Sequence, residues 1–285
     1  TGGLLHKIEG TNFTGSLLVG HSTTGTLSSA NFNTGVGIGA LDNLTTGNTN
    51  VAVGYAAGSN INTGTENVAL GSGAFQTATD SSRNIAIGRR ALSVQNVSGN
   101  AYNIAVGHDA GRNVTTGTQN TIVGGLAGDA LTEGDSNVAL GWASLSSETT
   151  GNRNTAIGWK SLLSLNNTAS AYNVALGFEA GLSVSTGIRN TILGGQAGDA
   201  LTTGSNNTII GYDATASAVD VSNEVTIGNS SITNVRIPSD STLKIGASGD
   251  LQLEHVSSNS FIKNTATGDL YIENQVDDAS IIFRC

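Results

Sequence analysis

Methionine is absent from the 285-residue chain, and cysteine and proline occur once each, as Cys285 and Pro238. A single cysteine excludes a disulfide framework or a cysteine-based zinc site within one chain. There is no run of about 18 apolar residues, so we expect no membrane insertion. Because the sequence starts at Thr1 and lacks methionine, we expect it to be a piece of a longer protein.

Charge is also scarce. Charged residues make up 12% of the chain, against about 25% in a typical globular protein, which argues against the solvated surface of an ordinary enzyme. The 12 lysines and arginines are scattered and the net charge is -9. Because the nucleic-acid backbone attracts basic surfaces, we expect no nucleic-acid partner.

Glycine, with 39 residues, is abundant and forms a repeat. Thirteen short apolar segments, such as NVALG at 67–71, end in a glycine, and successive glycines are 17 residues apart except for two spacings of 19. This regularity predicts an all-β fold, a parallel β-solenoid of about 13 coils with one coil per repeat. These motif glycines are Gly20, Gly37, Gly54, Gly71, Gly88, Gly107, Gly124, Gly141, Gly158, Gly177, Gly194, Gly211 and Gly228. Positions in a coil are numbered below from its motif glycine, negative before it and positive after it.

A second glycine stands at position -7 in seven coils, for example Gly47 and Gly64. Two glycines per coil fit two turns, since glycine adopts positive φ without a Cβ penalty. We therefore expect two short strands and two turns in each coil. Helices are disfavoured by the period-two apolar pattern and the glycine content.

The side chains of each segment alternate between two faces. Positions -3 and -1 carry Val, Ile, Leu or Thr, and we expect them to point into the coil. Position -2, as in Ala69 and Ala156, then points outward, and small apolar residues there indicate a second buried face. One thin coil offers nothing to cover that face, so we infer partner chains, arranged as a homotrimer.

Position -4 is asparagine in eleven of the thirteen coils. Stacked strands would bring these side chains to about 4.8 Å from one another. An amide has donors and an acceptor, so each could bond the coils on both sides, which favours a structural ladder over a binding row. The ladder residues are Asn33, Asn50, Asn67, Asn84, Asn103, Asn120, Asn137, Asn154, Asn173, Asn190 and Asn207.

The repeat stops after Gly228. The remaining segment contains the one proline and two similar strand patterns, at 249–253 and 268–272. We therefore divide the chain into an N-terminal lead-in (1–15), the solenoid (16–228) and a β-rich segment (229–285) that we expect to form a trimeric shaft.

The residue at position +1 is variable and is aromatic in five coils, as Tyr55, Trp142, Trp159, Phe178 and Tyr212. Variability at a turn indicates solvent or a partner surface. Exposed rings there would suit receptor groups such as sugars, so these five are candidate receptor-binding residues. The alternative is that the rings pack in the groove between chains of the trimer.

Catalytic patterns are missing. The four histidines, His6, His21, His108 and His255, form no metal-binding motif, and no two adjacent coils carry acids at one position, as a glycosidase pair would require. We expect no catalytic residue, no metal and no cofactor, although a site shared between chains is left open by this argument.

The N-x-A-[IVL]-G segment followed by a small turn resembles the head repeat of YadA-like trimeric adhesins over roughly 16–228. That resemblance implies a trimer of left-handed parallel β-rolls, although this family's best-known heads use a shorter coil. Residues 249–275 instead look like shaft segments of bacteriophage tail fibres.

Together these resemblances imply a structural and adhesive fibre segment, part of a bacteriophage tail fibre that attaches to a host surface. The expected location is the virion, and the expected partners are further copies of the chain, other virion tail proteins and a host cell-surface glycan or protein. The alternatives are the head of a bacterial trimeric adhesin at the cell surface and, less favoured, a glycan-cleaving tailspike.

Overall fold

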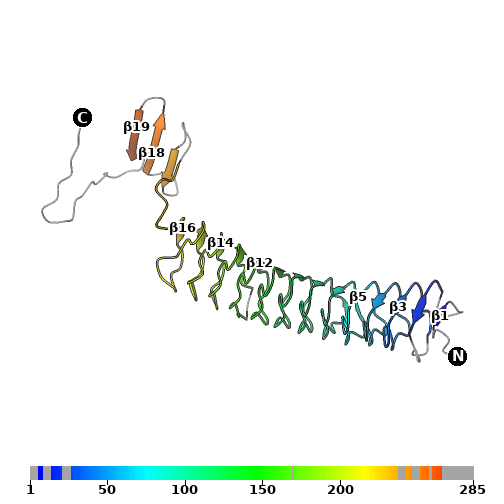
Figure 1. The fold of residues 1–285 in the computed structure, drawn as a ribbon. Coiled ribbons are helices and arrows are strands. Elements are labelled where there is room, and N and C mark those ends of the chain that lie inside the picture. The colour runs from blue at the N-terminus through cyan, green and yellow to red at the C-terminus, as the bar shows by residue number, and fades with distance from the viewer. Residues whose placement is uncertain are drawn as a thin grey trace. The chain divides into compact units, whose positions relative to one another are not determined.

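A computed structural model describes residues 6–8, 14–20, 27–168, 170–236, 242–245, 251–256 and 259–264. The chain divides into two units, Thr1–Ser231 and Ile232–Cys285. The first unit is a stack of coils wound along one axis (Figure 1). No helix occurs among the described residues, which confirms the all-β parallel solenoid.

One long sheet forms a wall of the solenoid. It contains fourteen strands in chain order, of which β1 (His6–Ile8) is antiparallel to its neighbour β2. The other thirteen strands are parallel, and each occupies positions -3 to -1 of its coil. They are β2 (Leu17–Val19), β3 (Thr34–Val36), β4 (Val51–Val53), β5 (Val68–Leu70), β7 (Ile85–Ile87), β9 (Ile104–Val106), β10 (Thr121–Val123), β11 (Val138–Leu140), β12 (Thr155–Ile157), β13 (Val174–Leu176), β14 (Thr191–Leu193), β15 (Thr208–Ile210) and β16 (Val225–Ile227).

The register of this sheet confirms one coil per repeat. Ala139 of β11 pairs with Ala156 of β12, which lies 17 residues further on. Ala86 of β7 pairs with Ala105 of β9, so a 19-residue coil keeps the same register. The two extra residues are therefore accommodated outside the sheet, and the motif glycines remain aligned.

The prediction of two strands per coil is wrong. Outside the long sheet, the described residues of the first unit hold only the two-residue pair β6 (Ser81–Ser82) and β8 (Gly99–Asn100) and an isolated bridge between Asn152 and Ser170. The rest of each coil is turn, because residues at positions -5 and +2 adopt left-handed φ, as Glu66 does at 60°. Left-handed residues interrupt an extended strand.

The two glycines of a coil are required for different physical reasons. The motif glycine Gly71 has φ of 131°, and a Cβ there would lie 2.6 Å from the carbonyl oxygen of Gly88. Gly47, at position -7, is not in the left-handed region, but a Cβ on it would lie 2.3 Å from the carbonyl oxygen of Gly64. The second glycine is thus required by the close approach of coils and not by a positive φ, which corrects the sequence interpretation.

The predicted orientation of the strands is inverted in the structure. The alanines at position -2, such as Ala69 and Ala156, are completely buried inside their own coil. The residues at -3 and -1 point outward instead, and Leu140 and Leu176 are 42% and 49% exposed. Small residues suit the inner face because the opposite side of the same coil lies directly across a narrow interior.

Side-chain volume is balanced across that interior. In coils with alanine at position -2, position +4 can be large, as at Phe75 and Leu92, which are fully buried. Ile122 takes position -2 of its coil, in which position +4 is Gly128, and position +4 of the preceding coil is Gly111. A Cβ on Gly111 would lie 2.9 Å from Cδ1 of Ile122, so Ile122 fills the space that this glycine leaves.

The second unit contains a three-stranded antiparallel sheet of β17 (Thr242–Ile245), β18 (Leu251–Val256) and β19 (Asn259–Asn264). The first strand pattern predicted for this region, at 249–253, overlaps β18. The second pattern, at 268–272, lies outside the described residues.

Candidate functional site: an aromatic ladder beside a buried amide ladder

Three aromatic side chains at position +1 form a continuous stack, which we call the aromatic ladder. The rings of Trp142 and Trp159 have centroids 5.5 Å apart, and those of Trp159 and Phe178 are 4.8 Å apart. The three side chains are 44%, 36% and 51% exposed in the single chain, in chain order. The in-register sheet produces this stack, because position +1 lies two residues after the ends of the aligned strands β11, β12 and β13.

The ladder presents ring edges to solvent more than ring faces. The planes of Trp159 and Phe178 are within 6° of parallel and those of Trp142 and Trp159 within 17°, so the inner faces cover one another. The ammonium group of Lys160 lies 4.3 Å from the centroid of Trp159, which adds a cation–π contact. Free ring faces therefore remain only at the two ends of the ladder.

The other two predicted receptor-binding residues stand apart from the ladder. Tyr212 follows Phe178 after one intervening coil, in which position +1 is Gly195. Tyr55 precedes Trp142 by five coils. Both tyrosines are exposed, and the hydroxyl of Tyr212 donates a hydrogen bond to Oε1 of Gln196 at 3.3 Å. The structure thus brings three of the five predicted residues into contact.

The asparagines at position -4 form a second row inside the solenoid. In the middle of this row, the side-chain oxygen of Asn120 accepts hydrogen bonds from the backbone N–H and the side-chain amide of Asn137, at 2.9 and 3.2 Å. The amide of Asn137 also donates to the carbonyl of Gly151 at 2.9 Å. All eleven asparagines are buried. Through these bonds, the side chain of Asn137 connects Asn120 of the preceding coil with Gly151, the position -7 glycine of the following coil.

The two coils without asparagine lie at the ends of the row. At the first, the hydroxyl of Ser16 accepts from the backbone N–H of Asn33 at 2.7 Å. At the last, Glu224 still donates its backbone N–H to Asn207, but its carboxylate accepts instead from Ser217 and Thr226. These hydrogen bonds lower the pKa of Glu224. The side chains at the ends therefore close the row where no further asparagine follows.

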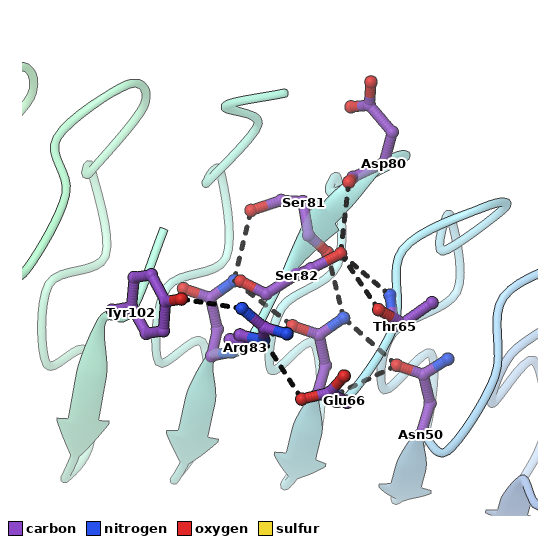
Figure 2. A network of polar contacts seen from close by, with 10 residues as sticks. Asn50, Thr65, Glu66, Asp80, Ser81, Ser82, Arg83 and Tyr102 are labelled. Atoms are coloured by element: carbon purple, nitrogen blue, oxygen red, sulfur yellow. Dashed lines mark hydrogen bonds and ion pairs between the residues drawn. The ribbon is translucent and has the colours of Figure 1, made fainter. Parts of the chain in front are cut away.

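An exposed polar cluster joins Glu66 and Arg83, which both stand at position -5 in adjacent coils (Figure 2). Nε of Arg83 lies 3.1 Å from Oε2 of Glu66, and Nη1 donates to the hydroxyl of Tyr102 at 2.7 Å. Hydrogen bonds to Glu66 and Tyr102 raise the pKa of Arg83. The contact confirms that equal positions in neighbouring coils lie side by side, although such exposed pairs add little stability.

A buried carboxylate in the core was not predicted from the sequence. Glu148 occupies position +7, which is apolar in most coils, and is 0% exposed. Its oxygens accept from the backbone N–H groups of Thr149 at 3.0 Å, Gly151 at 2.7 Å and Asn167 at 3.3 Å. These groups face a 19-residue coil, where the turn departs from the regular pattern. Burial nevertheless raises the pKa of Glu148, against the opposing effect of the backbone hydrogen bonds.

We expect Glu148 to make stability depend on pH. Because its pKa is raised in the folded chain, its contribution is fully present below the unfolded pKa of about 4.3 and is lost as the pH rises through the folded value. In Glu148→Gln this titration is absent. The measurement is the free energy of unfolding of both proteins in urea, from about pH 4 to pH 8. The value for the native chain minus the value for the variant should fall as the pH rises. A difference that grows with pH would contradict the raised pKa.

Comparisons with known proteins return no match. No family model, no curated protein and no solved structure is similar enough to this chain to assign a family. Among the described residues, no group of three or more His, Cys, Asp or Glu side chains gathers as a metal site would require. That part of the chain also lacks any helix with the length and apolarity to cross a membrane.

Proposed function

We propose that this chain is a structural and adhesive segment of a homotrimeric fibre, part of a bacteriophage tail fibre that contacts a host surface. One observation carries the proposal: an unbroken stack of coils bears an apolar strand face on its outside. This strand face consists of the outward residues at positions -3 and -1 of the thirteen parallel strands of the long sheet, and it contains exposed Val, Ile and Leu side chains along its length.

Self-association would cover the strand face. Isolated exposed apolar residues are ordinary, but a contiguous apolar surface marks an interaction site. The chain also carries few charges to keep such a surface soluble, at 12% of residues. Three copies of a rod packed along their strand faces would bury these rows together and leave the turns outside. The association surface is therefore the strand face, and not the alanines at position -2.

Adhesion is assigned to the row at position +1, next to the strand face. The aromatic ladder and the separate Tyr55 and Tyr212 offer exposed rings to a host glycan or protein. A trimer would present three such rows, which raises weak affinities through avidity. Neighbouring virion tail proteins would hold the fibre at its ends, and the role needs neither a cofactor nor membrane insertion.

The double variant Trp142→Ala with Trp159→Ala tests the adhesive role. If the ladder binds the host surface, attachment of the fluorescently labelled fibre to host cells is lost, while the Tm of the assembly changes by only a few degrees. If the rings instead pack between chains, the Tm falls by several degrees more, because burial of two indoles is lost. Tyr172→Ala provides the control, because Tyr172 is an exposed ring at position -5, outside the row at position +1.

Two alternatives make different predictions. A bacterial trimeric adhesin head would belong to a gene that encodes a secretion signal and a membrane anchor, whereas a tail fibre gene encodes a domain for attachment to the virion. A glycan-cleaving tailspike would shorten host polysaccharide during incubation with the purified protein, and gel filtration of the polysaccharide would detect that shortening.

A further inference from the structure

The aromatic ladder ends at a coil that lacks a side chain at position +1. Phe178 is its last ring, Gly195 occupies the next coil, and Tyr212 the one after. With strands about 4.8 Å apart, residues two coils apart are separated by about 10 Å. Inside the ladder each coil contributes one ring, so the coil of Gly195 has room for one ring that the chain does not supply.

The backbone does not explain the glycine at this position. Gly195 is outside the left-handed region, and a Cβ on it would lie 3.5 Å from Cδ2 of Tyr212, which is ordinary contact. On the side of Phe178, the nearest atom is that residue's backbone oxygen at 4.0 Å. Among the described residues the Phe178 ring stacks only on Trp159, and Phe178 is 51% exposed.

A polar rim borders the open position. The side-chain amide of Gln196 accepts a hydrogen bond from the hydroxyl of Tyr212 at 3.3 Å and donates one to Oε2 of Glu179 at 3.3 Å. Gln196 and Glu179 are both half-buried, and they lie at position +2 of adjacent coils. An apolar ring face beside a row of hydrogen-bonding groups matches a ligand that has one apolar face and a polar perimeter.

We propose that the gap at Gly195 is a binding subsite for one neutral sugar ring, held between the rings of Phe178 and Tyr212. The C–H face of a pyranose stacks on an aromatic face, and its hydroxyl groups can bond with Gln196 and Glu179. The carboxylate of Glu179 and the net charge of -9 disfavour an acidic sugar. This assignment rests on the proposed host-surface attachment and names its ligand class.

The chain contains a matched control for this subsite. Seventy residues earlier, Gly125 stands at position +1 between His108 and Trp142. There, however, Leu126 replaces Gln196, and the carboxylate in the place of Glu179 is that of Asp109. Asp109 is only 3% exposed and is bound to Arg90 at 2.8 Å. The Gly125 coil therefore has a gap without the glutamine and the half-buried glutamate that border Gly195.

The test is to fill each gap with a ring. Gly195→Phe should continue the aromatic ladder and occupy the subsite, whereas Gly125→Phe extends the other end of the ladder. Saturation-transfer NMR with methyl glycosides of glucose, galactose and mannose, and with sialic acid as the acidic probe, measures binding. We expect the native protein and Gly125→Phe to bind at least one neutral glycoside, and Gly195→Phe to lose about tenfold or more in affinity.

Melting curves followed by circular dichroism check that both variants remain folded. Tyr212→Ala provides a second test, because it leaves the gap open but removes one of the two rings that border it. We expect that variant also to weaken neutral-sugar binding. Equal binding by the native protein and Gly195→Phe, preference for sialic acid, or no binding of any neutral glycoside would overturn the subsite. Host-cell attachment, measured in parallel, distinguishes the sugar subsite from the proposed fibre function. If Gly195→Phe still attaches to host cells but no longer binds sugar, the fibre function does not depend on this subsite.

Discussion

Asn137→Ala is expected to destabilise the solenoid strongly, as is the same truncation at other inner members of its row. The side chain makes four hydrogen bonds, two as donor to Asn120 and Gly151 and two as acceptor from the backbone and side chain of Asn154. The partners are buried, so water does not replace the lost bonds. Since a buried unsatisfied group costs about 1–3 kcal/mol, we expect a total loss of roughly 4 kcal/mol or more.

Asn43→Ala is the matched control. Asn43 also bonds a side chain one turn on, with Nδ2 donating to Oδ1 of Asn60 at 2.7 Å, but this pair is exposed. Its loss should cost less than about 1 kcal/mol, because water can take the place of the partner. Urea denaturation of the two variants gives the comparison. Similar losses for the two variants would show that burial of the amide row contributes nothing beyond one ordinary hydrogen bond.

The period of the repeat was sufficient to predict the coil and its register. Glycines every 17 or 19 residues align the strands, and the contact between Glu66 and Arg83 follows from equal positions in adjacent coils. The placement of asparagine before each strand was likewise visible, because an amide repeated at one position has stacking partners in both directions. Regular spacing is a strong signal because each coil contacts mainly its neighbours.

Which side chains of each strand point into the coil could not be predicted from the strand residues alone. Alternation separates Ala156 from Thr155 and Ile157, but it does not say which set is inside. The deciding signal lies elsewhere in the coil, where Leu162 at position +4 and Leu165 at position +7 are fully buried. Those residues already fill much of the narrow interior, so only small residues fit on the inner face of the strand. The combination of Ile122 at position -2 with Gly128 at position +4 carries the same information.

The candidate site was predictable in position but not in geometry. The row at position +1 follows from the repeat, whereas the mutual stacking of Trp142, Trp159 and Phe178 depends on side-chain torsions that the spacing leaves open. Glu148 was missed for a related reason. Its position in the repeat is an apolar core position, and its backbone partners are created by the departure of the longer coil from the regular turn.

Leu140→Glu with Leu176→Glu is expected to convert the assembled fibre segment into single chains. Both leucines lie on the strand face and are about half exposed in the single chain, so the coil itself tolerates a longer polar side chain there. In a trimer packed along the strand face, the same change buries six carboxylates without partners. An unpaired buried charge costs several kcal/mol, which exceeds what the surrounding apolar contacts can offset. Sedimentation velocity should show the mass of one chain, with the circular dichroism of the folded solenoid retained.

Thr116→Glu with Thr186→Glu is the control, because these two threonines are exposed, lie 70 residues apart and stand outside the long sheet. The control variant carries the same two added charges as the leucine variant, so it separates the effect of net charge from the effect of changing the strand face. The control variant should sediment as the native assembly does. An intact trimer in both double variants would place the association surface somewhere other than the strand face, and a native protein that sediments as a single chain would reject the homotrimer itself.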